Sequence, residues 1–263
     1  MNINFLIKIK EFDAHGGPAT KTMGGDGHEM TPTTAGRFVI ASIEKHVSYG
    51  KYALWSGVPW GAGLKFINNV TYVDVSNKGL WKRLTVYRPL WLKTYKTEEA
   101  ITRAILDYWV TIGFATYAGN HVALYGMQTP DRWVFNDFGH ISVKYFRDTN
   151  YNGVLDKNES ILGDFIHTIP GSEAISYYNS TRQTNQSKFV VDLPGSHGCI
   201  HVKPTDVDTM IGSGYLKKGQ VIVVHGYNEK VMPTTIKPDK YTRKGYEAHF
   251  FPGLFKIAIY KIT

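Results

Sequence analysis

Short apolar runs interrupted by glycine limit the folds open to this 263-residue chain. None of these runs approaches the length of about 20 residues that a membrane-spanning helix needs. Aromatic residues make up 14% of the chain, with 17 Tyr, and glycine occurs 26 times. Aromatic and β-branched residues suit the pleated surface of a sheet, and glycine suits the turns between strands. We therefore expect a mainly β fold, of the β-rich α+β class.

Alternation of apolar and polar residues, as in 1–12 and 70–76, and short apolar runs next to turn residues predict where the strands lie. The segments with strand character are 1–12, 37–49, 51–61, 70–76, 132–146, 163–169, 217–226 and 254–262. A Thr N-cap, two Glu in the first turn and apolar residues at helical spacing predict a helix over 97–110. A short helix is also expected over 205–211. The long polar stretch 171–187 predicts an inserted loop.

The chain is basic, with a net charge of +8 and a pI near 9.3. This charge suits an acidic partner, which could be nucleic acid, anionic lipid or an acidic cell-wall polymer, and it does not choose among them. Residues 77–96 interleave basic and aromatic side chains. An amphipathic element with a buried aromatic face is the simpler interpretation; a surface that grips a glycan or single-stranded nucleic acid is the alternative.

The only cysteine, Cys199, lies in the sequence "PGSHGCIHVKP" between His197 and His201. A single cysteine excludes an intramolecular disulfide, so its thiol is free for chemistry or is inert. Gly198 allows a sharp turn and a close approach of substrate, so that backbone N–H groups can face an oxyanion. A nearby imidazolium can lower the pKa of a thiol. A buried thiol and a zinc site with the two histidines are the alternatives, but a spacing of two residues is unusual for zinc ligands. The pattern favours a nucleophile.

The segment "SHGCI" (196–200) resembles the signature of the L,D-transpeptidase catalytic-domain family, cysteine enzymes that remodel bacterial peptidoglycan. Four further segments are similar to family segments and occur in the same order. They are "TPTTAGRF" (31–38), "LWSGVPWG" (54–61), "FIHT" (165–168) and "GQVIVVHG" (219–226). The resemblance implies a β-sandwich catalytic domain over 1–226, with insertions at about 77–131 and 171–187. The second insertion could cover the site as a lid. Residues 227–263 would form a C-terminal extension packed on this domain.

The resemblance also implies a role for each site residue. Cys199 would attack the third residue of a tetrapeptide stem, with His167 as the base. Ser196 and His197 would shape the turn and hold substrate or imidazole, and the Gly198 and Cys199 N–H groups would bind the oxyanion. His201 and Thr168 would contact substrate.

Two features depart from the family pattern. The 28 residues between His167 and Ser196 exceed the usual spacing, which leaves His140 as a second candidate base. His201 stands where the family usually has Arg or Asn.

The thioester could pass to different acceptors. Transfer to an amine would make the protein a transpeptidase, whereas water or a D-amino acid would make it an L,D-carboxypeptidase or an exchange enzyme, conceivable as an interbacterial toxin. A calcium-dependent cell-wall-binding protein without turnover is the alternative of another class. The expected partners are peptidoglycan stem peptides rather than nucleic acid, and the oligomeric state stays open.

The segment "DTNYNGVLDKNE" matches a twelve-residue calcium loop, with Gly153 at the turn position. The expected ligands are Asp148, Asn150, Asn152, the Val154 carbonyl, Asp156 and Glu159. Three carboxylates indicate modest affinity, and the alternative is a solvated Asn-Gly turn without metal. Calcium would be structural, and no cofactor is expected for catalysis.

Peptidoglycan substrates place the expected site of action in the periplasm or cell wall. Lys8 and Lys10 interrupt the apolar N-terminal segment, which is therefore a poor secretory signal. We expect either a non-standard export route or a signal that has already been removed.

Overall fold

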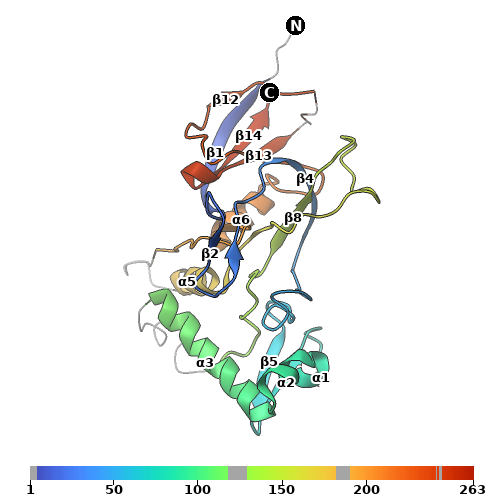
Figure 1. Cartoon of the computed structure of the whole chain (residues 1–263), viewed down its shortest axis with the longest axis vertical. Coiled ribbons are helices and arrows are strands. Elements are labelled where there is room, and N and C mark those ends of the chain that lie inside the picture. Colours follow the sequence, from blue (N-terminus) through green and yellow to red (C-terminus); the bar gives the residue numbers. More distant parts are fainter. Residues whose placement is uncertain (1–4, 118–128, 182–189, 241, 243–244) are drawn as a thin grey trace. The chain divides into compact units, whose positions relative to one another are not determined.

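The computed structural model describes residues 5–117, 129–181, 190–240, 242 and 245–263 (Figure 1). It divides into two compact units. The main unit contains Met1–Glu44, Ser142–His167 and Asp192–Thr263, and the second unit contains Lys45–Ile141 and Thr168–Val191. About 29% of the chain is strand and 20% is helix, which confirms the prediction of a β-rich fold.

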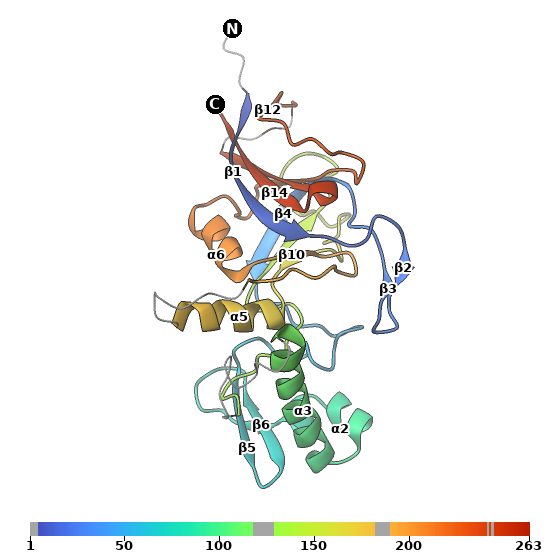
Figure 2. The ribbon, with the colours of Figure 1, turned by 90° about the vertical axis from the view of Figure 1, so that its left-hand side faces the viewer.

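The main unit is built on one large mixed sheet. Its strands, in spatial order, are β10 (Ile200–Val202), β9 (Ile166–His167), β8 (Ser142–Phe146), β4 (Gly36–Glu44), β11 (Val221–Val224), β13 (Tyr246–Phe251), β14 (Lys256–Ile262), β1 (Leu6–His15) and β12 (Thr235–Ile236). The helix α6 (Pro204–Gly212) follows β10, as expected for 205–211, and η1 (Pro252–Leu254) joins β13 to β14. Figure 2 shows these elements from a second direction.

The sheet closes on itself where β1 pairs with both β14 and β10. The first part of β1 pairs antiparallel with β14, and its last two residues, Ala14 and His15, pair with Val202 and His201 of β10. This pairing brings the end of the N-terminal strand beside the strand that follows Cys199. A strand separated from the cysteine motif by nearly 200 residues therefore contributes to its surroundings.

The C-terminal residues belong to this sheet. Residues 227–263 were expected as an extension packed on the catalytic domain, but they supply β12, β13 and β14. Alternate apolar side chains of β14 face the core, where Ala258 and Tyr260 pack with Leu6 and Phe251. The 254–262 strand prediction is confirmed because "KIAIYKI" buries its apolar residues.

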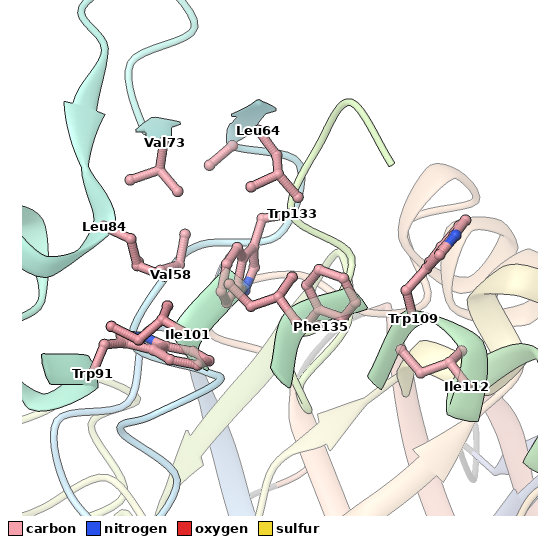
Figure 3. Close-up of a cluster of buried hydrophobic side chains, with 12 residues drawn as sticks. Val58, Leu64, Val73, Leu84, Trp91, Ile101, Trp109, Ile112, Trp133 and Phe135 are labelled. Atoms are coloured by element: carbon pink, nitrogen blue, oxygen red, sulfur yellow. The ribbon is translucent and has the colours of Figure 1, made fainter. Parts of the chain in front are cut away.

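The second unit combines a small sheet with helices. It contains β5 (Gly63–Ile67), β6 (Val70–Asp74), β7 (Lys82–Arg83), α1 (Leu84–Tyr87), α2 (Leu90–Tyr95), α3 (Glu98–Tyr117) and α5 (Pro170–Thr181). Its core contains four buried tryptophan and phenylalanine side chains, Trp91, Trp109, Trp133 and Phe135, together with aliphatic residues of β5, β6 and α3 (Figure 3). Thr97 Oγ1 accepts the Ala100 N–H at 3.1 Å, so the predicted N-cap of α3 is present.

Residues 77–96 match the simpler of their two interpretations. Leu84 and Trp91 are buried in the core of the second unit, whereas the lysines of this segment are exposed. The expected insertion at about 77–131 lies within this unit, and its residues 118–128 lie outside the described part of the chain.

The predictions over 51–61, 132–146 and 171–187 were wrong in whole or in part. Residues 51–61 form turns, because Gly50, Gly57 and Pro59 interrupt extended backbone and the Ser56 N–H bonds to the Tyr52 carbonyl at 3.0 Å. Of 132–146, only Ser142–Phe146 is strand.

The polar stretch expected as a loop at 171–187 begins as the helix α5. Pro170 starts this helix with a suitable φ, Glu173 favours its N-terminus, and the helix packs on α3. Residues 182–187 lie outside the described part, as do residues 1–4 of the first predicted strand. Within the described residues, no helix is both long and apolar enough to cross a bilayer.

Candidate functional site

Cys199 ends a tight turn immediately before β10, and its side chain is partly exposed. The turn depends on Gly198, whose φ of +134° lies in a region that L side chains rarely adopt. A Cβ at Gly198 would also come within 3.0 Å of Asp164 Oδ1 and 3.1 Å of Thr31 Oγ1. Only glycine therefore lets the backbone pass at this point, which agrees with its place in the sequence motif.

The Cys199 thiol is held by backbone groups. Its sulfur accepts the Phe165 N–H at 3.4 Å and donates to the Gly163 carbonyl at 3.7 Å. Both of these contacts are with the backbone, and neither involves an imidazole. Burial raises the pKa of the thiol to about 12, the Phe165 N–H opposes this rise, and the Asp164 carboxylate adds to it. The thiol is therefore protonated at neutral pH, and nucleophilic attack requires a base.

Ser196 stabilises the turn through hydrogen bonds within it. Its Oγ accepts the Gly198 N–H at 3.1 Å and donates to the Cys199 carbonyl, and its own N–H donates to the Gly16 carbonyl at 3.2 Å. The Gly198 N–H is thus engaged within the turn, which differs from the expected oxyanion contact. For the Cys199 N–H, no acceptor is found in the part of the chain that the structure describes.

Three histidines from neighbouring strands lie in register. His15 of β1 pairs with His201 of β10, which in turn pairs with His167 of β9. The His167 and His201 rings meet edge to face, with centroids 4.9 Å apart. The sequence predicted the last two as site residues and assigned no role to His15, because its pairing with β10 is set by long-range topology.

Two of these rings are fixed by carbonyl groups of the segment before the motif. His15 Nδ1 bonds to the Leu193 carbonyl at 2.6 Å and His201 Nδ1 to the Pro194 carbonyl at 2.8 Å. A carbonyl only accepts hydrogen bonds, so each Nδ1 carries the proton. Burial lowers the pKa of His201 to about 4; the Pro194 carbonyl opposes this and the His15 and His197 rings add to it. His201 is a neutral imidazole at neutral pH.

His197 points to a residue that the sequence did not indicate. The hairpin of β2 (Thr22–Met23) and β3 (Glu29–Met30), seen in Figure 2, carries Asp26 at its tip. The Asp26 carboxylate oxygens lie 3.0 and 3.1 Å from His197 Nε2. Burial opposes ionisation of Asp26, but the His28 N–H and the His197 ring outweigh it and hold its pKa below its usual range. The aspartate is anionic at neutral pH.

The other two residues named from sequence belong to the second unit. Glu173 of α5 accepts hydrogen bonds from the His140 N–H at 3.1 Å, from His140 Nδ1 and from Thr168 Oγ1. His140, the second candidate base, and Thr168, expected to contact substrate, are thus both bonded to one carboxylate.

The calcium-like loop is closed by hydrogen bonds to its own backbone. The Asp148 carboxylate accepts the Asn152 and Gly153 N–H groups, and Glu159 accepts the Asp156 N–H at 3.1 Å. The side-chain amides of Asn150 and Asn152 both donate to Asp156 Oδ2, at 2.7 and 2.8 Å. The described residues contain no group of three or more His, Cys, Asp or Glu side chains arranged to hold a metal ion. The oxygen donors share one loop, but metal binding would require them to turn away from these partners.

A second cluster of titratable groups lies elsewhere in the main unit. His225 is hydrogen-bonded to Glu229 at 2.8 Å and to His249 at 3.0 Å. His249 is also hydrogen-bonded to Glu247 at 3.2 Å. Arg37 adds a two-pronged ion pair to Glu247. Burial lowers the pKa of His249, and its contact with Glu247 opposes the change.

No known protein family, curated protein or solved structure gives a significant match to the chain. Its chemistry must therefore be inferred from the residues themselves and from the resemblance of the motif.

Proposed function

We propose that this protein is a peptidoglycan-modifying cysteine acyltransferase, an L,D-transpeptidase whose nucleophile is Cys199. The observation that carries the proposal is a partly exposed cysteine on a glycine-dependent turn, directly before the first of three adjoining strands whose histidines lie in register. A cysteine placed only for packing needs neither a strained glycine beside it nor imidazoles in register. A nucleophile needs a base and a backbone that can approach its substrate.

The reaction begins with proton transfer from the thiol. With a thiol pKa of about 12, the proton must leave as the sulfur attacks. His167 is the proposed acceptor, since it lies on the strand beside β10 and its ring is held against neutral His201. The sulfur must first leave its contacts with Phe165 and Gly163. Such a rearrangement on substrate binding is ordinary, because catalytic hydrogen bonds often tighten only in the complex.

The bond changes follow acyl-transfer chemistry. The sulfur bonds to the carbonyl carbon of the third residue of a tetrapeptide stem, and the C–N bond to the terminal D-alanine breaks. The imidazolium returns its proton to the leaving amine. The Cys199 N–H is the proposed oxyanion donor; one such donor contributes about 3 kcal/mol in comparable sites. An acceptor amine then attacks the thioester and restores the thiol. This substrate would place the activity in the periplasm or cell wall, and the chemistry needs no cofactor.

The test is mass spectrometry of tetrapeptide muropeptides incubated with the protein and with Cys199→Ala. We expect loss of D-alanine and cross-linked products with the unchanged protein only. Tripeptides without cross-links would replace transpeptidase by carboxypeptidase, and exchange of the terminal residue for added D-amino acid would indicate an exchange enzyme. Turnover that survives Cys199→Ala would remove the nucleophile.

The base is tested by a matched pair of variants. His167→Gln should lower turnover by about 100-fold or more, the usual contribution of a general base. His140→Gln, which alters the histidine bonded to Glu173, should have a much smaller effect. The reverse order would assign the base to His140. Unchanged muropeptides with every variant and with the unchanged protein would favour a wall-binding role.

A further inference from the structure

We propose that Asp26 is a positioning residue that fixes the orientation and tautomer of His197 beside Cys199. This inference deepens the proposed function, because it concerns the activation of the same thiol. The contact joins a hairpin near the N-terminus to the turn of the cysteine motif, across 171 residues of sequence.

The first support is the contact itself. Both carboxylate oxygens of Asp26 lie within 3.1 Å of His197 Nε2, and an anionic carboxylate only accepts hydrogen bonds. His197 Nε2 must therefore carry a proton. In a neutral ring, Nδ1 is then the nitrogen that lacks the proton, and the ring belongs to a residue two positions from Cys199 in the sequence. A carboxylate that orients an imidazole next to a nucleophile is the arrangement that catalytic triads use.

The second support is that the hairpin is packed against the motif by backbone contacts. Thr31, directly after β3, donates its hydroxyl to the His197 carbonyl at 3.0 Å. A Cβ at Gly17 would overlap the Thr31 carbonyl and would lie 3.2 Å from the Gly198 Cα. These three backbones are in close contact, and the tip of the hairpin is thereby held over the turn.

The third support is that the hairpin tip requires glycine at one position but has room for a side chain at the next. A Cβ at Gly24 would lie 2.7 Å from Asp26 Oδ1 and 3.2 Å from His197 Nε2, so a side chain there would disturb the pair. The adjacent Gly25 has no atom within 4 Å of the same point. The tip also fixes Asp26 through the His28 N–H, which donates to Asp26 Oδ1 at 3.0 Å.

Other titratable groups of the described residues also lie around His197. The His28 ring on the hairpin faces the His197 ring, with centroids 6.3 Å apart. His201 on β10 interacts electrostatically with His197, and the Asp164 carboxylate lies next to Gly198. The Asp26 and His197 side chains are 45% and 30% exposed. Solvent therefore weakens the pair, and its effect should be moderate.

The experiment uses the single cysteine of the chain. The rate of Cys199 alkylation by iodoacetamide, followed by intact mass from pH 6 to pH 10, reports thiol activation without any peptidoglycan substrate. We expect Asp26→Asn to slow alkylation at neutral pH roughly fivefold, the upper end for an exposed pair, and to change the shape of the pH profile. Asp26→Glu should restore part of the rate. His197→Gln should match Asp26→Asn, and the double variant should be no slower than either.

The neighbouring glycines supply the matched control. Gly24→Ala should behave like Asp26→Asn, whereas Gly25→Ala should leave the pH profile unchanged. Additive effects of Asp26→Asn and His197→Gln, or equal effects of the two glycine variants, would overturn the inference. A uniform loss of rate with a lower melting temperature and no change in the pH profile would also overturn it, since that is the result of a merely structural role. Coupled alkylation without turnover of muropeptides would refute the proposed function alone.

Discussion

Lowering the pH from 7 to 5 should destabilise the main unit through the buried His201. The folded-state pKa of this histidine is about 4 against an ordinary value of 6.5, and the residue is only 8% exposed. A lowered folded-state pKa means that the unfolded chain binds more protons between pH 4 and pH 6.5. The contribution of neutral His201 to the free energy of unfolding is therefore complete above pH 6.5, and it is lost as the pH falls toward 4.

The magnitude follows from these two values. At pH 5 the unfolded histidine is almost fully protonated, whereas the folded one is about one-tenth protonated. The resulting loss of unfolding free energy is about 2 kcal/mol between pH 7 and pH 5, and it approaches about 3 kcal/mol near pH 4. This is a large part of the stability of an ordinary domain.

The assay is urea unfolding at both pH values, with His201→Gln as the test variant and His28→Gln as the control. Glutamine keeps an N–H for the Pro194 carbonyl but does not titrate, and His28 is exposed. Between pH 7 and pH 5, His201→Gln should lose about 2 kcal/mol less stability than the unchanged protein. His28→Gln should keep the full pH dependence. Equal pH dependence in His201→Gln and the unchanged protein would refute the argument from burial.

Two further outcomes are expected. Gly198→Ala should lower stability by about 1–3 kcal/mol in thermal unfolding and slow Cys199 alkylation, because alanine must adopt a strained φ; an unchanged melting temperature would contradict this. Calcium titrated into metal-free protein should bind weakly, with a dissociation constant of about 0.1–1 mM, because the loop must give up its own hydrogen bonds. Glu159→Gln should abolish the heat in calorimetry, and no heat from the unchanged protein would remove the calcium site.

Local patterns in the sequence predicted the elements that local physics decides. The apolar run in β14 and the capping pattern of α3 correspond directly to the observed strand and helix. The prediction over 51–61 was wrong because Gly50, Gly57 and Pro59 interrupt extended backbone in a segment that is otherwise rich in aromatic and aliphatic residues. The helix α5 was missed because its serine, tyrosine and asparagine residues are poor helix formers and its stability comes from packing on α3.

The residues of the candidate site also fall into two groups, those that the local sequence predicts and those that only long-range contacts bring there. The turn at Gly198 and the choice of Cys199 as the candidate nucleophile could be predicted from five consecutive residues, because the turn itself requires glycine. Asp26 and His15 could not be found in this way. Each reaches the motif through a contact that spans more than 170 residues, and nothing in the glycine-rich loop or the first strand marks the partner.

These distant contacts bear on the chemistry more than the cysteine itself does. A thiol with a pKa of about 12 is nearly inert at neutral pH, so the presence of Cys199 alone does not make an enzyme. The proposed activity depends on which imidazole can take the proton. His201 is neutral but has its Nδ1 bonded to a carbonyl, His197 is oriented by Asp26, and His167 lies against His201. Because these rings are held by different partners, substitution of each partner should separate their roles. The alkylation profile of Asp26→Asn and the turnover of His167→Gln therefore test two distinct steps, the orientation of one imidazole and proton transfer by another.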